Sequence, residues 1–163
     1  MERNCLVFSD VHGSSEAMKR IREAGRYFSS ERMISAGDLC PDPYDPLFFS
    51  IEGARGNCDR FYEYGSLPFP PSVFTTGIYG RKVLVTHGHT PVDIPCDTDV
   101  LITGHTHIPM LKRKGNLYFL NPGSASLPRS SEGATFALFT PSALRLFSLD
   151  DFREIRSLSF SSS

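Results

Sequence analysis

The stretch "LVFSDVHG", residues 6 to 13, joins a short apolar run to a pair of polar side chains. A run such as "NCLVFS" (4–9) is typical of a buried strand. Asp10 and His12 follow where that strand would end, and Gly13 permits a tight turn. Because ligands bind at the carboxyl ends of strands in α/β sheets, the stretch predicts both an α/β fold and a binding site.

The same arrangement recurs at four more places along the chain. In each, polar side chains follow a short apolar segment, and a glycine lies beside them. All five histidines of the protein lie in these four segments or in the first one. The residues are Asp38 in "MISAGDLCP" (33–41), Asn57, Cys58 and Asp59 in "ARGNCD" (54–59), His87 and His89 in "VLVTHGHT" (83–90), and His105 and His107 in "VLITGHTHIP" (100–109). Five segments that direct polar groups to one edge predict a functional site there.

The rest of the chain predicts one strand–helix–strand section followed by hairpins. Residues 14–28 have apolar side chains at helical spacing, with Ser14 or Ser15 as the cap. A second strand is expected at 32–35, a short helix in 46–54 and a loop over 90–99. Hairpin turns are expected at Tyr79-Gly80, Lys114-Gly115 and Pro141-Ser142. We therefore expect one domain over 1–163, an α/β sandwich of two sheets with helices outside, and a frayed tail at 158–163.

Composition excludes several other classes of protein. The chain has 163 residues, of which 40% are hydrophobic and 21% charged, as expected for a globular domain. A net charge of −1 gives no signature of nucleic-acid or anionic-membrane binding. No apolar run is long enough for a membrane span, and the N-terminus lacks a signal-peptide pattern, so a cytoplasmic location is expected. The four cysteines form no CxxC pair, and a disulfide framework is not expected.

The polar residues at the strand ends have the chemistry of metal ligands. One histidine at a strand end is more often an ordinary surface or core residue, so the inference rests on the whole set. Imidazole and carboxylate groups suit zinc, iron and manganese, and there are too many of them for one ion. We expect two ions roughly 3.5–4 Å apart, bridged by a carboxylate. Asp38 is the best candidate because it stands alone after its strand, whereas Asp59 could equally cap a turn.

The five segments, taken in order, resemble the calcineurin-like metallophosphoesterase superfamily. The superfamily pattern is D-x-H, then G-D, then G-N-[H]-[D/E], then a single histidine, then G-H-x-H. The sequence "GNCD" is similar to small bacterial and archaeal phosphodiesterases of this superfamily. The resemblance extends from Leu6 to about Leu149 and includes "NPGSASLPR" (121–129). It implies a four-layered α/β/β/α sandwich, with two mixed sheets flanked by helices.

The resemblance also implies a reaction and a set of ligands. The expected reaction is hydrolysis of a small-molecule phosphoester, a diester in preference to a monoester, by a metal-bridging hydroxide. The cofactors would be two divalent ions, with manganese favoured and zinc, iron or nickel also suitable. The implied catalytic residues are Asp38, Asn57, His87 and His105. The implied ligands are Asp10, His12 and His107 for the first ion, Asn57, His87 and His105 for the second, and Asp38 for both.

Three further residues are candidates for substrate contact. Cys58 occupies the position where many relatives carry a histidine that protonates the leaving group. Its thiol is a weak donor, and it could be a wall residue, a catalytic group or a redox group. Arg55 could face the phosphoryl group or be a solvated surface residue. His89 could orient His87, contact substrate or cap its loop. Segments 39–56 and 90–99 are short for the family, which predicts an open site.

Two other functions compete with hydrolysis. The retromer subunit of the same fold serves protein assembly, and its distinguishing feature would be missing ligands. In this chain all seven ligand positions are filled. A metallo-β-lactamase-type hydrolase would need H-x-H-x-D-H, which the sequence lacks. Exposed edge strands would permit a homo-oligomer.

Overall fold

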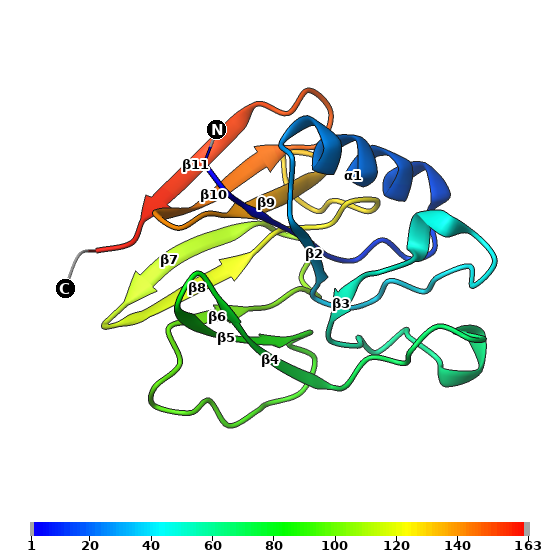
Figure 1. Ribbon diagram of the computed structural model, residues 1–163, viewed down its shortest axis with the longest axis horizontal. Coiled ribbons are helices and arrows are strands. Elements are labelled where there is room, and N and C mark those ends of the chain that lie inside the picture. The colour runs from blue at the N-terminus through cyan, green and yellow to red at the C-terminus, as the bar shows by residue number, and fades with distance from the viewer. Residues whose placement is uncertain (1, 162–163) are drawn as a thin grey trace.

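Two mixed β-sheets packed face to face form the body of the computed structural model, which describes residues 2–161 (Figure 1). Each sheet contains both parallel and antiparallel neighbours, as the resemblance implied. The six-stranded sheet has, in spatial order, β11 (Glu154–Ser159), β10 (Ala143–Ser148), β9 (Thr135–Phe139), β1 (Cys5–Phe8), β2 (Arg32–Ser35) and β3 (Glu52–Gly53). The five-stranded sheet has β4 (Val73–Ile78), β5 (Arg81–Thr86), β6 (Val100–Ile102), β8 (Leu117–Asn121) and β7 (Met110–Lys114).

Strand β1 is buried on both faces. Leu6 and Phe8 pack toward the helix α1 (Ser15–Tyr27), whereas Cys5 and Val7 pack between the two sheets. This double burial explains the unbroken apolar run in the sequence. It also means that the residues after Phe8 emerge in the middle of the fold, where the loops of both sheets can reach them.

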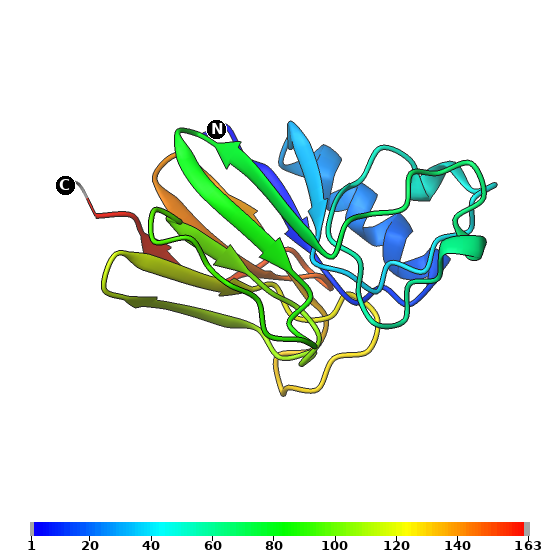
Figure 2. The same cartoon turned by 90° about the horizontal axis from the view of Figure 1, so that it is seen from below.

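Helix α1 covers the outer face of the six-stranded sheet (Figure 1). Ser14 caps it as predicted, because its hydroxyl accepts a hydrogen bond from the Ala17 amide at 3.1 Å. Its first turn follows His12 directly, and Figure 2 shows that end of α1 beside the loops over residues 40–51 and 56–72. The helix buries Ala17, Met18, Ile21 and Ala24, which are among the apolar side chains at helical spacing in residues 14–28.

A loop takes the place of the second helix layer. The outer face of the five-stranded sheet buries Leu84 and Leu101, which are 2% and 7% exposed. The loop over 87–99 runs along that face, and Pro95 and Thr98 lie with Leu84 in one shallow pocket (Figure 1). Thus the helix layer on the six-stranded sheet is confirmed, and the one expected on the other sheet is absent from the described residues. Among those residues, none of the helices is both long and apolar enough to cross a membrane.

The shorter elements follow the prediction with small shifts. The expected helix in 46–54 is a single 3₁₀ turn, η1 (Pro46–Phe48), capped by Asp45. It stops early because the chain then pairs with β2 as β3. A second 3₁₀ turn, η2 (Phe61–Glu63), follows the "GNCD" segment. The β7–β8 turn falls at residues 115–116, one position late, because Lys114 still pairs with Leu117.

The predicted frayed tail at 158–163 is wrong for residues 158–160. Leu158 pairs with Leu144 inside β11. The Phe160 ring lies 4.9 Å from that of Tyr118 and 5.5 Å from that of Phe139, and the Arg81 guanidinium covers it at 3.7 Å. Burial of an aromatic ring between the two sheets fixes a segment that its serine content suggested would be loose. Residues 162–163 lie outside the described part of the chain.

This packing predicts a measurable role for Phe160 in stability. We expect Phe160→Ala to lower the free energy of unfolding by about 2 kcal/mol, which is less than the roughly 3–5 kcal/mol of a fully buried phenylalanine. The smaller value reflects the half-buried position of Phe160. Urea unfolding would measure the change, with Ser159→Ala as the control at an exposed position of the same strand. Equal stability of the two variants would contradict an ordered C-terminal segment.

Candidate metal centre

The loops after β1, β2, β5 and β6 meet at one place. The backbone amides of Asp10 and His12 donate to the carbonyls of Gly37 and Asp38 at 3.0 and 2.8 Å, which ties the β1 and β2 loops together. In the other sheet, the Gly104 amide donates to the His87 carbonyl at 3.0 Å. The carboxyl ends of parallel strands in both sheets therefore open onto a shared centre.

The backbone turns sharply at five of the predicted ligands. A positive φ is uncommon for residues other than glycine and costs about 1–3 kcal/mol when a structure enforces it. Here it occurs in the loops that follow β1, β2 and β6. The five residues are Asp10 (56°), His12 (50°), Asp38 (55°), His105 (72°) and His107 (63°). Such concentration of backbone strain at one place is typical of a functional site.

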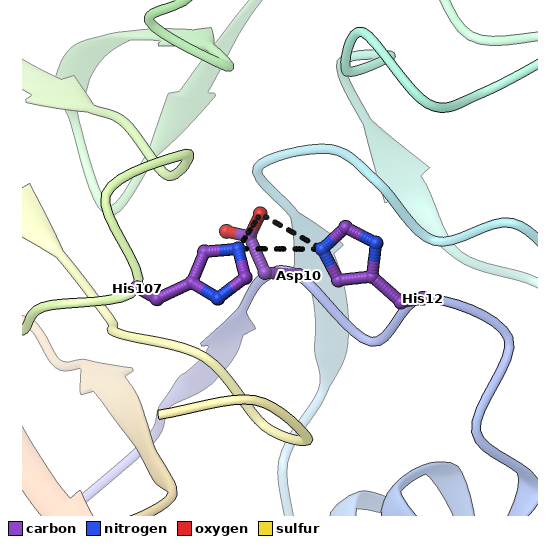
Figure 3. Close-up of side chains that lie close together, drawn as sticks. All are labelled: Asp10, His12 and His107. Carbon is purple, nitrogen blue, oxygen red and sulfur yellow. Dashed lines mark hydrogen bonds and ion pairs between the residues drawn. The ribbon is translucent and has the colours of Figure 1, made fainter. Parts of the chain in front are cut away.

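Asp10, His12 and His107 form the first group of ligand atoms (Figure 3). Asp10 Oδ1 lies 3.3 Å from His107 Nε2 and 3.6 Å from His12 Nε2. The two Nε2 atoms are themselves 3.3 Å apart. These three side chains are the ones that the resemblance assigned to the first ion.

Two further groups share residues with the first. His87 Nε2 lies 3.1 Å from Asp38 Oδ2 and 3.7 Å from Asp10 Oδ1. His12, Asp38 and Cys58 form the third group. Asp10 and Asp38 each belong to two groups, so both have the placement that a bridging carboxylate needs.

The hydrogen bonds of the histidines test whether a cation fits. The Nδ1 atoms of His87 and His107 contact the carbonyl oxygens of Ala36 and Leu127 at 2.8 and 2.7 Å. A carbonyl only accepts, so each Nδ1 carries the proton and, in the neutral ring, each Nε2 presents a lone pair. His87 Nε2 and Asp10 Oδ1 are buried and have no hydrogen-bond partner within residues 2–161. Lone pairs that converge in this way suit a divalent cation.

The pKa values of the two central partners move in opposite directions. Burial raises the pKa of Asp38, but the ion-pair contact with His87 and the hydrogen bond from the Cys58 amide outweigh it and leave the pKa below its ordinary value. Burial lowers the pKa of His87, yet the carboxylate of Asp38, 3.1 Å from Nε2, leaves the net pKa raised. In the absence of a cation, His87 thus retains a proton more readily than a free histidine. A metal ion must displace that proton.

Asp59 binds the backbone of the loops that carry Asp38 and Asn57, and its carboxylate is used there rather than at the candidate metal centre. Its carboxylate accepts hydrogen bonds from the amides of Asp38 (2.9 Å), Cys40 (2.9 Å) and Gly56 (2.8 Å) and from the hydroxyl of Tyr64 (2.8 Å). Of the two readings that the sequence left open, the structure favours the backbone cap. The Tyr64 contact had no local sequence signal, because the hydroxyl is brought in by the turn that follows η2.

Serine hydroxyls fix Asp10, and sequence reasoning missed them. Ser9 Oγ donates to Asp10 Oδ2 at 2.6 Å, and the His105 amide donates to the same oxygen at 3.0 Å. Ser124 and Ser126 both donate to the Asp10 carbonyl, at 2.8 and 2.9 Å. The position of "NPGSAS" after a strand was the available signal, since polar residues follow that strand as they do the others.

Asn57 and His105 lie on the open side of the centre. Both are exposed, and the His105 ring centroid is 5.1 Å from that of His87. Asn57 Nδ2 donates to Cys58 Sγ at 3.6 Å. Cys58 also shares a group of possible ligand atoms with His12 and Asp38, so it borders the candidate metal centre directly. Burial, followed by the nearby Asp38 charge, raises the pKa of its thiol.

His89 and Arg55, the other two candidates for substrate contact, lie beside other residues in the structure. His89 is exposed, with its ring 5.5 Å from that of His87 and 6.1 Å from that of His105. It does not orient His87 through Nδ1, because the Ala36 carbonyl occupies that nitrogen. Arg55 Nη1 donates to the Pro70 carbonyl at 2.9 Å, and its guanidinium lies 5.2 Å over the Phe69 ring. Arg55 is thus half-buried rather than freely solvated.

Comparison with known proteins agrees with this geometry. Residues 4–143 match the family described as the calcineurin-like phosphoesterase superfamily domain. Phosphodiesterase YfcE of Escherichia coli (strain K12) is 29% identical over 170 residues, covering 90% of this chain and 92% of that protein. The probable metallophosphoesterase YsnB of Bacillus subtilis (strain 168) is 30% identical over 149 residues, covering 84% and 83%.

Solved structures share the fold. The structure of YfcE, titled a phosphoesterase from E. coli, superposes with a TM-score of 0.83 at 24% identity and covers 97% of this chain and 100% of that one. Vps29 of Entamoeba histolytica, solved complexed with Zn²⁺, gives a TM-score of 0.67 at 22% identity and covers 97% and 99%. The fold thus occurs in proteins with different names and roles.

The close packing around Asp10 predicts the effect of one added methyl group. A Cβ at Gly104 would lie 2.2 Å from Ser9 Oγ and 2.8 Å from Asp10 Oδ2, so Gly104→Ala must displace the Asp10 carboxylate. We expect Mn²⁺ affinity to fall about 10- to 100-fold, as it does for other changes just outside a ligand shell. Isothermal titration calorimetry would measure it. Gly77→Ala is the control, because open space surrounds that position; equal affinities for the two variants would refute the geometry.

Proposed function

The chain belongs to the calcineurin-like phosphoesterase superfamily, and we propose that it is a phosphodiesterase that uses two divalent metal ions to hydrolyse a small-molecule phosphoester. The observation that carries the proposal is the convergence of unpartnered ligand atoms, Asp10 Oδ1 and His87 Nε2, at a centre formed by both sheets. The named relatives YfcE and YsnB support phosphoester hydrolysis as the reaction class.

Seven residues would hold the two ions. Asp38 would lie between them, and its membership of two ligand groups supports that role. Manganese is our first choice, with zinc, iron or nickel also compatible with imidazole and carboxylate ligands. The proposed ligands are Asp10, His12 and His107 for the first ion and Asn57, His87 and His105 for the second.

The protein's own residues would prepare the reaction by position and charge. When bound, the two ions would offset charge on the phosphoryl group and activate water for attack on phosphorus. Asp59 keeps the Asp38 and Asn57 loops at a fixed separation through its bonds to both backbones. His89 and Arg55, near the open side, would contact the phosphate oxygens or the ester arms. Positioning of this kind lowers the activation barrier of the reaction without any movement of the ligands.

Cys58 would border the reacting phosphate without acting as nucleophile. Its thiol lies with His12 and Asp38, and burial and the Asp38 charge raise its pKa in the absence of metal ions. A thiol donates protons poorly compared with an imidazolium. This arrangement favours substrates whose leaving group departs without a proton.

A protein-assembly role is the competing proposal, because Vps29 proteins share the fold. Hydrolysis is favoured here by the complete ligand set and the "GNCD" segment shared with the phosphodiesterase type. A metal-loaded protein that binds two ions yet hydrolyses neither mono- nor diesters would support the scaffold instead.

Metal stoichiometry provides the first test. Asp38→Ala should weaken the binding of both ions, because its carboxylate would contact each. His107→Ala should chiefly weaken the binding of one. Elemental analysis after dialysis and calorimetry with Mn²⁺ would count the ions, and a chelator should abolish hydrolysis. Asp97→Ala removes an exposed carboxylate paired with Lys82 and is the matched control. A single tight ion in fully active protein would exclude the two-metal proposal.

Substitution of Cys58 provides the second test. Cys58→Ala should retain both ions and most activity toward an activated aryl diester, whose leaving group needs no proton. Cys58→His should accelerate hydrolysis of an unactivated alkyl diester, because general-acid help is typically worth about 10²- to 10⁴-fold. Rates would be compared at equal metal occupancy. Loss of aryl-diester hydrolysis in Cys58→Ala, with both ions still bound, would show that the thiol is catalytic.

A further inference from the structure

Exposed aromatic side chains follow the metal loop and have no role in the hydrolysis proposed above. Phe61 and Tyr62 begin the η2 turn, and each has 75% of its surface exposed. Large aromatic side chains are usually buried, so two in succession at the surface call for an explanation. Figure 2 shows the loop over residues 56–72 at the same end of the molecule as the start of α1, which follows His12.

These aromatics belong to an ordered arrangement. The Phe61 ring packs edge-on against Phe69, with centroids 5.6 Å apart and planes at 85°. Tyr64 packs against Phe69 in the same manner, at 5.1 Å and 87°. Because the Tyr64 hydroxyl is bound to Asp59, which holds the backbone of Asp38, the aromatic group is anchored directly to the metal loops. We call Phe61, Tyr64 and Phe69 the aromatic edge.

A positive charge lies against the aromatic edge. The Arg55 guanidinium lies 5.2 Å over the Phe69 ring, and Arg55 precedes the proposed ligand Asn57 by two positions. Phe61 follows Asn57 by four positions, so roughly 14 Å is the greatest separation that the chain allows between their Cα atoms. In sequence, a cation and an exposed ring therefore lie on either side of a proposed metal ligand.

We propose that the aromatic edge binds an aromatic ring, a nucleobase or another aryl group, on one ester arm of the substrate. This rests on the proposed function only in placing the phosphoryl group at the metal ions. The exposed surface of Phe61 offers a stacking surface, and the Arg55 guanidinium over Phe69 adds a positive charge beside it. Stacking accepts any flat ring, so the edge selects a chemical class rather than one compound.

Two phosphonates test the proposal without turnover, because their carbon–phosphorus bond is not an ester. Phenylphosphonate and methylphosphonate carry the same anionic head and differ only in the ring. We expect the Mn²⁺-loaded protein to bind phenylphosphonate about tenfold more tightly, near the low end of what one stacking partner contributes. Calorimetry measures both affinities in the same buffer.

Variants at Phe61 assign that preference to the aromatic edge. Phe61→Ala should make the two affinities equal while leaving that for methylphosphonate unchanged, and Phe61→Tyr should restore the preference. Loss of an exposed ring does not threaten the fold. Tyr27→Ala is the matched control, because Tyr27 is an aromatic residue 64% exposed at the far end of α1.

The outcomes separate this proposal from the enzymatic one. Equal binding of the phosphonates to the wild-type protein, no binding of either, or a preference that survives Phe61→Ala would overturn the aromatic edge. Hydrolysis of bis(4-nitrophenyl) phosphate is measured in parallel. Hydrolysis without a ring preference would refute the edge alone, whereas a ring preference without hydrolysis would support the edge and refute the phosphodiesterase.

Discussion

The hydrogen bonds to Asp10 are the interaction on which the rest of the structure depends. Its amide is bound to Gly37, its carbonyl to two serines of the 124–126 segment, and Oδ2 to Ser9 and the His105 amide. These contacts tie together the loops of both sheets. They leave Oδ1 without a hydrogen-bond partner among residues 2–161, facing the ring nitrogens of three histidines. A buried carboxylate oxygen without a partner is unfavourable, so the fold is organised for something that binds there.

The same organisation weakens the protein when no cation is bound. Strained backbone at five ligand positions and converging lone pairs both oppose folding. A ligand that binds only the native state stabilises it by an amount that grows with the logarithm of the ratio of ligand concentration to dissociation constant, about 2.7 kcal/mol at a ratio of 100. Binding of a cation at the proposed site would therefore couple the stability of this protein to metal supply.

The sequence predicted the strand ends well because local pattern and chemistry agree there. An apolar run followed by Asp or His at a glycine is readable without knowledge of the fold, and the predicted ligands Asp10, His12, Asp38, His87 and His107 do come together. Contacts that join distant segments were not readable. Tyr64 reaches Asp59 through a turn with no motif, and Phe160 is ordered by rings contributed by other strands. Secondary-structure propensity does not include such packing, so it predicts a loose tail where serines are frequent. It also cannot show that a loop replaces a helix layer.

That loop, residues 87–99, has a consequence for the dynamics of the molecule. Its end is held by two hydrogen bonds between Asp99 and Lys82. The Asp99 amide donates to the Lys82 carbonyl, and the Lys82 amide donates to the Asp99 carboxylate, whereas a helix would have many more backbone hydrogen bonds. Segments with few such bonds open at a lower free energy than the surrounding sheet. Its first residue is the proposed ligand His87, and the strand that follows it leads to His105. If His87 binds a metal ion as proposed, that ion would fasten one end of the segment, and metal occupancy would then set how often the outer face of the five-stranded sheet is exposed to water.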